Sequence, residues 1–142
     1  MGDEGMVHAL LLAHRILRPD GVLISIQYLA MPHLIEVYSP ESVHKVGWLL
    51  DREGFADERS ASNALAEAVS NRDYVLEDEL DFEYPYYVDS LPEYNEWIAG
   101  WWSTAYHLEG TSQQLEESLR ISGPSAKIVL VMKARMTRLK AA

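Results

Sequence analysis

Two short apolar runs, at residues 22–26 and 128–132, constrain the fold of this chain more than any other feature. The first reads Val-Leu-Ile-Ser-Ile and the second reads Ile-Val-Leu-Val-Met, so apolar side chains fill nearly every position instead of alternating with polar ones. Runs of this kind are typical of strands that are covered on both faces of a sheet. The chain has 142 residues, the size of one ordinary domain. We therefore expect a single α/β domain, residues 1–142, whose sheet contains both runs.

The segment before the first apolar run predicts a helix that leads directly into a strand. Apolar residues recur there at helical spacing and would give the helix a broad buried face. They are Met6, Leu10, Ala13 and Leu17. The Arg-Pro-Asp-Gly sequence at residues 18–21 ends this helix, because proline does not continue a helix easily and Asp-Gly favours a turn.

Residues 39–71 predict a second helix, a strand and a short third helix. Ser39 and Pro40 supply an N-cap and a proline for the first turn, and Gly54 would end the helix in a left-handed conformation. The apolar face of this helix comprises Val43, Val46, Leu49 and Leu50. A strand is expected over residues 55–60 and an alanine-rich helix over residues 63–71.

Residues 74–123 resemble a helical, aromatic-rich insertion before the last strand. They include an acidic run at residues 77–81 and an aromatic run at residues 84–87. A capping box that begins at Ser90 predicts a helix to about Leu108, and a further helix is expected over residues 111–121. Gly123 and Pro124 then break the chain, and the last strand follows over residues 126–133.

The charge of the chain is acidic and unevenly distributed. The formal net charge is −10, from 12 basic and 22 acidic residues. Residues 51–96 hold 14 Asp or Glu and 3 Arg, whereas residues 118–142 hold six Lys or Arg and no acid. A nucleic-acid surface needs several cations opposite phosphates, and six dispersed cations are more simply a solvated end of an acidic protein. Nucleic acid is therefore not expected as a partner.

The composition excludes several further kinds of chemistry. The chain has no cysteine, which rules out disulfides, thiolate catalysis and cysteine-ligated zinc. No apolar run approaches 18 residues and the N-terminus has no export pattern, so we expect no membrane association and a cytoplasmic location. The five histidines lack His-x-x-x-His spacing and the acidic run lacks the calcium-loop pattern, so no metal site is expected.

The order of these elements, with the residues at their ends, resembles the C-terminal half of a class I S-adenosylmethionine-dependent methyltransferase. In that family a helix leads through a proline–glycine turn into the fifth strand, which residues 9–25 match. A capped helix that ends in Gly-Phe then precedes the sixth strand, as at residues 39–55. A substrate-covering insert and an antiparallel seventh strand follow, as at residues 84–123 and 126–135. The resemblance implies a partial Rossmann-like sheet of three main strands, with the last one antiparallel between the other two.

The resemblance covers the substrate-facing half of that fold and not its cofactor-binding half. The chain has no Gly-x-Gly-x-Gly loop and no acid that would end the second strand and bind the ribose, so no cofactor-binding residue is assigned. It implies a transferase that is inactive alone and binds S-adenosylmethionine weakly or not at all, unless another chain or a missing segment supplies the cofactor half. Two alternatives stay open. One is a non-catalytic small-molecule-binding or protein-interaction module of the same origin, and the other is a truncated fragment.

The candidate site residues are two histidines and several polar or aromatic side chains. His33 follows the first strand, where ligands bind in open α/β sheets, and a histidine can act as a general base near neutral pH. His33 and His107 are therefore the candidate catalytic residues. The candidate substrate-binding residues are Gln27, Tyr28, Tyr86, Tyr87, Trp97 and Trp101. The aromatic residues have a second interpretation, in which they only dock the insertion on the sheet.

The first strand also carries an expectation about association. In the methyltransferase-like sheet it would pair on its far side with a fourth strand that this chain does not contain. An unpaired apolar edge invites another strand or needs covering, so we expect a homodimer or a complex with a cofactor-binding partner. The same interpretation places Ile24 at the centre of the sheet, where Ile24→Asp would unfold the protein.

Overall fold

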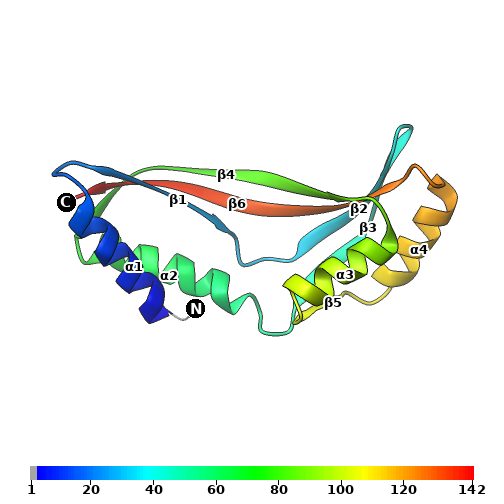
Figure 1. Cartoon of the computed structure of the whole chain (residues 1–142), viewed down its shortest axis with the longest axis horizontal. Helices are drawn as coiled ribbons and strands as arrows, with labels where there is room; N and C mark the ends of the chain where they lie inside the picture. The colour runs from blue at the N-terminus through cyan, green and yellow to red at the C-terminus, as the bar shows by residue number, and fades with distance from the viewer. Residues whose placement is uncertain (1–2) are drawn as a thin grey trace. The chain divides into compact units, whose positions relative to one another are not determined.

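The computed structural model describes residues 3–142, which form four helices and six strands (Figure 1). Met1 and Gly2, part of the N-terminal segment without an export pattern, lie outside that range. The chain divides into two compact units. Unit 1 comprises the chain up to Ala30, Phe55–Phe82 and Lys133–Ala142, and unit 2 comprises Met31–Gly54 and Glu83–Met132. Strands β4 (Tyr74–Val88) and β6 (Lys127–Ala141) each contribute residues to both units.

The fold is mixed α/β, and its strands are antiparallel. β1 (Val22–Tyr28) and β2 (His33–Ser39) each pair with β6, β2 also pairs with β3 (Ser42–Asp51), and β3 pairs with the short β5 (Ala105–His107). β4 pairs with β6. The α/β class is confirmed, and so is the antiparallel last strand beside the first one. The Rossmann-like sheet is not confirmed, because such a sheet is mostly parallel.

In unit 1, two helices cover one face of the strands. α1 (Asp3–Ile16) and α2 (Ala56–Ser70) lie next to each other on one side of the strands (Figure 1). Their apolar faces meet Tyr74 of β4 and Leu139 of β6 in one core. The Tyr74 hydroxyl is satisfied inside this core, where it donates to the backbone oxygen of Leu10 at 2.7 Å. The expected helix over residues 6–17 and the turn after it are confirmed, and the Gly21 amide closes that turn on the Arg18 oxygen at 2.7 Å.

β1 is covered on one face only, which corrects the expectation that it is buried on both. Its residues alternate between exposed and partly buried along the whole strand. Ile24 keeps 49% of its surface exposed, because α1 and α2 cover only the face that carries Leu23 and Ser25. A polar residue at position 24 would therefore stay in water, and Ile24→Asp is no longer expected to unfold the protein.

Unit 2 buries a larger apolar cluster between its strands and two helices. α3 (Leu91–Trp101) and α4 (Thr111–Ser122) belong to this unit together with β2, β3 and β5. The fully buried side chains of the cluster include Ile35, Tyr94, Leu115, Ile128 and Leu130. α3 begins at the predicted cap, where the Ser90 hydroxyl accepts a hydrogen bond from the Glu93 amide, but it ends at Trp101 and not near Leu108. The helix expected over residues 111–121 is confirmed as α4.

The helix expected over residues 39–54 is wrong, because this segment is the turn and second strand of a β2–β3 hairpin. Ser39 pairs with Ser42, and the Ser42 amide donates to the Ser39 hydroxyl at 3.2 Å. Pro40 follows Ser39 at the second position of the tight turn, which suits proline as well as the first turn of a helix does. Valine and tryptophan in the segment that follows also favour a strand, and the hairpin buries Val46 and Leu49 in the core of unit 2.

Two further segments differ from the expectation. Residues 55–60, expected as a strand, open α2, which also contains most of the short helix expected over residues 63–71. Phe55 has φ 59°, so the chain changes direction there, and Asp57 and Glu58 occupy the first helical turn, where acids suit the helix dipole. Residues 74–88, expected as the start of a helical insertion, form the long strand β4.

Candidate functional site

A pocket of about 410 Å³ lies within unit 1, between α2 and the strands that α2 covers. This volume is in the range of small-molecule sites, roughly 300–1,000 Å³. One part of its lining is apolar and comes from Leu65, Ala66, Val69, Leu76 and Leu139. The other part is polar and contains Gln27, Ser62, Glu79, Arg135 and Thr137.

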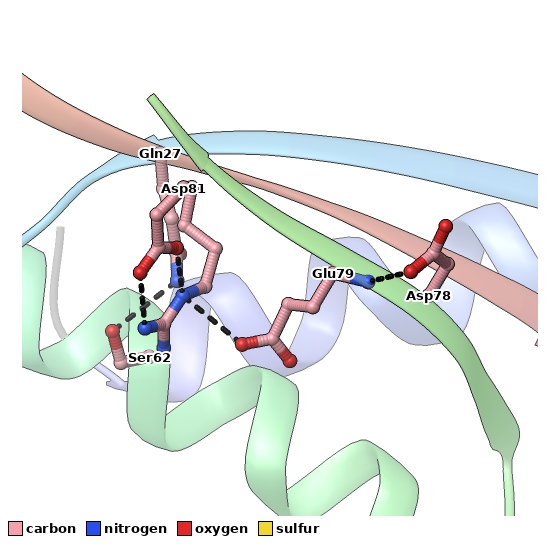
Figure 2. Close-up of polar contacts among 6 residues, drawn as sticks. Gln27, Ser62, Asp78, Glu79 and Asp81 are labelled. Carbon is pink, nitrogen blue, oxygen red and sulfur yellow. Dashed lines mark hydrogen bonds and ion pairs between the residues drawn. The ribbon is translucent and has the colours of Figure 1, made fainter. Parts of the chain in front are cut away.

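The register of β1 against β6 brings part of the polar lining together. Gln27 on β1 lies directly opposite Arg135 on β6, and Ser25 lies opposite Thr137. Residues opposite one another in an antiparallel pair point to the same face, which here is the face that α2 covers. Gln27 then reaches Ser62 on α2, and its Nε2 donates to the Ser62 Oγ at 3.2 Å (Figure 2).

The Gln27 side chain leaves one strong hydrogen-bonding atom without a partner. Its Oε1 is buried, and no hydrogen-bond partner for it is found among residues 3–142. An unpaired buried amide oxygen costs about 1–3 kcal/mol, so folded proteins rarely retain one without a reason. This atom lies on a residue that lines the pocket.

Two carboxylates hold the guanidinium of Arg135 at the same end of the pocket. Its Nε and Nη2 donate to the two oxygens of Asp81 at 2.7 and 3.0 Å, and its Nε also lies 3.0 Å from an oxygen of Glu79. The hydrogen bond from Arg135 lowers the pKa of Asp81, and the same bond raises the pKa of Arg135. Figure 2 shows Glu79 and Asp81 on β4 beside Gln27 and Ser62. One cation against two carboxylates gives this group a net negative charge.

A second polar cluster lies in unit 2 and contains His107. The Tyr94 hydroxyl is 2.8 Å from His107 Nε2, and the Ser112 hydroxyl is 2.9 Å from His107 Nδ1. Burial lowers the pKa of His107 and raises the pKa of Tyr94. A neutral phenol does not stabilise a positive imidazole as a carboxylate does, so this chain of groups suits a structural link between α3, β5 and α4 better than proton transfer. The catalytic role of His107 stays a prediction.

Removal of the Tyr94 hydroxyl tests the structural interpretation of this cluster. Tyr94 is fully buried, so Tyr94→Phe deletes its hydrogen bond to His107 and leaves an imidazole nitrogen unpaired. We expect the free energy of unfolding to fall by about 1–2 kcal/mol, measured by urea titration. The matched control is Tyr106→Phe, because Tyr106 is exposed and should change stability by less than about 0.5 kcal/mol. Equal stabilities of the two variants would contradict a linking role.

The other candidate catalytic residue, His33, lies inside unit 2. It is the first residue of β2, is 3% exposed, and its ring centroid lies 5.0 Å from that of Trp102. Burial lowers the pKa of His33 to about 4. Such an imidazole is neutral but only weakly basic near neutral pH. His33 is buried and His107 is partly buried, and neither residue lines the pocket of unit 1.

The remaining candidates are dispersed. Tyr28 is exposed on the face of β1 opposite to Gln27. Tyr86 stacks on Trp97 at a centroid distance of 5.0 Å, and both pack against the core of unit 2, as the docking interpretation proposes. Tyr87 is exposed and meets the ring of Tyr38 edge-on. Trp101 is 82% exposed, so it does not share the environment of Trp97.

Of the candidate residues predicted from the sequence, Gln27 lines the pocket, and the residues around it were not among the candidates. Ser62 lies in the segment where no long helix was expected, and the partners of Arg135 become evident only when β4 and β6 are paired. The acidic run and the basic C-terminal residues were both noticed, but as separate surfaces. The opposite charges of these two segments are the signal that could have indicated their pairing. Arg138 on β6 also binds Glu77 on β4.

Comparisons with known proteins add no assignment. The chain matches no protein-family model, and no curated protein or solved structure is significantly similar to it. Within residues 3–142 no helix is long and apolar enough to span a membrane. In the same part of the chain no three His, Asp or Glu side chains gather in an arrangement that would hold a metal ion.

Proposed function

We propose that this chain is a non-catalytic small-molecule-binding protein, and that the pocket of unit 1 holds its ligand. The observation that carries the proposal is the buried, unpartnered Oε1 of Gln27 on the lining of a pocket of ligand size. Apolar lining with a few convergent polar groups is the usual composition of such sites. The ligand therefore has a compact apolar body and a hydrogen-bond donor that reaches Gln27.

The charges around the pocket select among ligands of that size. Arg135 is already bound by Asp81 and Glu79, so no free cation is left there to attract an anion. The net negative charge of this group repels carboxylates and phosphates and attracts ammonium groups. Primary amines and neutral amides with an aromatic or branched apolar body fit both the charge and the acceptor.

The methyltransferase interpretation rests on the sequence resemblance and not on the pocket. The resemblance was carried in part by a helix over residues 39–54, and that segment is a hairpin. S-adenosylmethionine carries a carboxylate beside its ammonium and sulfonium groups, and the pocket offers that carboxylate no unpaired cation. A transferase activity stays a prediction from the sequence resemblance, and the binding proposal does not use it.

Three probes of the same size and different charge test the proposal. Benzylamine, benzamide and benzoate share one ring and differ in donor and charge. In titrations followed by amide NMR, we expect the first two to shift the signals of Ser62, Val69 and Thr137, and benzoate to leave them unchanged. Gln27→Leu should weaken benzylamine binding about tenfold, the equivalent of one hydrogen bond of about 1.4 kcal/mol.

Matched variants separate the pocket from the rest of the surface. Ala66→Trp places an indole in the space that Ala66 lines and should abolish the shifts, whereas Gln113→Leu changes an exposed glutamine on α4 and should leave them intact. Binding that survives Ala66→Trp, or benzoate binding as strong as that of benzylamine, would overturn the proposal.

A further inference from the structure

β1 is an edge strand whose outer backbone groups can be identified. Among residues 3–142 it pairs with β6 alone. The Gly21 oxygen accepts from the Ala141 amide at 2.8 Å, and the Leu29 amide donates to the Lys133 oxygen at 2.9 Å, so the odd-numbered residues bond to β6. In an antiparallel pair such residues alternate with residues whose N–H and C=O point the other way. The peptide groups of Val22, Ile24 and Ile26 therefore point away from the sheet.

This edge lacks the features that prevent strands from pairing between molecules. Proteins protect sheet edges with charged side chains, prolines or bulges. β1 reads Val-Leu-Ile-Ser-Ile-Gln-Tyr and has no charge and no proline, and its register against β6 is regular. β4, which also pairs with β6 alone in the described chain, has five acids between Glu77 and Glu83. One edge of unit 1 is thus protected and the other is not.

The side chains of the same three residues form an apolar strip on the face that the helices leave uncovered. Val22, Ile24 and Ile26 are 38%, 49% and 64% exposed. A single exposed apolar side chain needs no explanation, but a contiguous row along an unprotected edge is the signature of an interaction site. Backbone and side chains of β1 therefore require the same kind of partner, an apolar strand.

We propose that two copies of this chain associate through β1, antiparallel and with the two-fold axis at Ile24. This register places Ile24 opposite Ile24 of the other copy and Val22 opposite Ile26 of the other copy. All three residues of each copy then exchange backbone hydrogen bonds with their counterparts, and the two apolar strips become continuous. A two-fold axis requires a self-complementary surface, and β1 provides one.

The charge distribution favours pairing of β1 with β1 of a second copy and opposes pairing of β1 with β4 of that copy. Two chains of net charge −10 repel each other, and β1 is a neutral strand through which they can approach. β1 has no cation to offer the acids of a β4 strand, so pairing of β1 with β4 of another copy is unfavourable. Arg138, opposite Ile24 on β6, is already paired with Glu77, and the two Arg138 residues would lie about 14 Å apart across three strand spacings, beyond the screening length of about 8 Å.

The dimer is independent of the ligand pocket. Gln27 points to the helix-covered face and Ile24 to the uncovered face, so a variant at one residue leaves the other surface intact. A single seven-residue strand buries less than the roughly 800 Å² per partner of a standard interface, and we expect a dissociation constant in the micromolar range.

Sedimentation equilibrium over a concentration series measures the association directly. We expect the average mass to rise from 16.1 kDa toward twice that value. Ile24→Lys places two like charges on the axis and should weaken association by about 100-fold, so that the variant stays monomeric. The control is Ile121→Lys, which changes an exposed isoleucine on α4 and should dimerise like the parent. A parent that stays at 16.1 kDa, or an Ile24→Lys variant that still dimerises, overturns the proposal.

Cysteine cross-linking tests the register and does not depend on whether the lysine variant folds. The chain has no cysteine, so a single introduced thiol can only pair with another copy. Paired residues at the axis lie about 5.5 Å apart between Cα atoms, within disulfide range, so Ile24→Cys should form a covalent dimer on mild oxidation. Ser25→Cys points to the opposite face and should cross-link at least tenfold more slowly. Faster cross-linking of Ser25→Cys, or none at position 24, would show that the strands do not pair in this way.

Discussion

Gly47→Ala is expected to destabilise the protein by about 3 kcal/mol or more, although it adds only one methyl group. A Cβ atom on Gly47 would lie 2.1 Å from the Thr111 Oγ1 and 2.7 Å from the Thr111 Cβ and Cγ2. Thr111 cannot move aside easily, because it is buried at the first residue of α4 and its hydroxyl accepts a hydrogen bond from the Trp48 amide at 3.2 Å. Gly47 also has φ +155°, a conformation that strains other residues.

The local register explains why α4 approaches β3 so closely at this point. Ile35 pairs with Gly47 and Glu36 with Lys45, so Val46 is an extra residue in β3 and makes a bulge. The bulge exposes the backbone of Gly47 to the start of α4, and only hydrogen fits between them. Gly47 is therefore a structural residue of the β3–α4 contact.

Urea titration measures the effect, and a second variant identifies its cause. Thr111→Gly removes all three atoms that the new methyl group would meet, so Gly47→Ala should cost less in that background than in the parent. Gly100→Ala is the matched control: Gly100 lies in α3 with no atom within 4 Å of its added Cβ, and alanine there should stabilise the helix by up to about 1 kcal/mol. A destabilisation by Gly47→Ala below about 1 kcal/mol would contradict the close contact.

The elements that were predicted correctly are those with local stop signals. α1 ends at a proline–glycine turn, and α4 is bounded by glycines at positions 110 and 123. The start of β6 after that second glycine was also predicted, but the strand continues to Ala141 and does not end near residue 133. The β2–β3 hairpin was missed because Val43, Val46 and Leu49 fit a helical stripe as well as they fit strands, and Ser39-Pro40 can begin either structure. The valines and tryptophan of this segment favour a strand and its leucines favour a helix, so local propensity alone does not decide, whereas burial of both hairpin strands in the core of unit 2 does.

The sequence alone indicates those residues of the candidate site whose position follows from their own strand, and not those whose position depends on the pairing of distant strands. Gln27 is a candidate from the sequence because it lies at the end of a strand that the apolar run marks. Arg135 and Asp81 are 54 residues apart, and their ion pair depends on the pairing of β4 with β6, which no local pattern encodes. The continuous apolar run in β1 suggested burial on both faces, but its odd residues face α2 and its even residues form the exposed edge. One strand thereby supplies two surfaces with different chemistry.

Acidification from pH 7 to pH 4 is expected to lower the stability of the parent by about 3 kcal/mol through His33 alone, since burial lowers its pKa from 6.5 to about 4. Above about pH 6.5 His33 is neutral in both the folded and the unfolded state, so its protonation does not affect the free energy of unfolding. As the pH falls, the unfolded chain takes up a proton at this residue and the folded chain does not, so unfolding becomes easier until the folded pKa is reached. Burial lowers the pKa of His107 as well, and its contribution has the same sign.

The slope of the free energy of unfolding against pH isolates the contribution of His33, whereas the free energy at a single pH does not. His33→Leu keeps an apolar side chain beside Trp102 and has no proton to gain, so its free energy of unfolding in urea should decline less between pH 6.5 and pH 4 than that of the parent. His44→Gln, at an exposed position of β3, should retain the full slope of the parent. Asp81 and Glu117, the carboxylates with lowered pKa, contribute at the acidic end of this range, but they are present in both the parent and His33→Leu, so the difference between the two slopes does not include them. Parallel curves for the parent and His33→Leu would mean that the imidazole of His33 is hydrated in the folded protein.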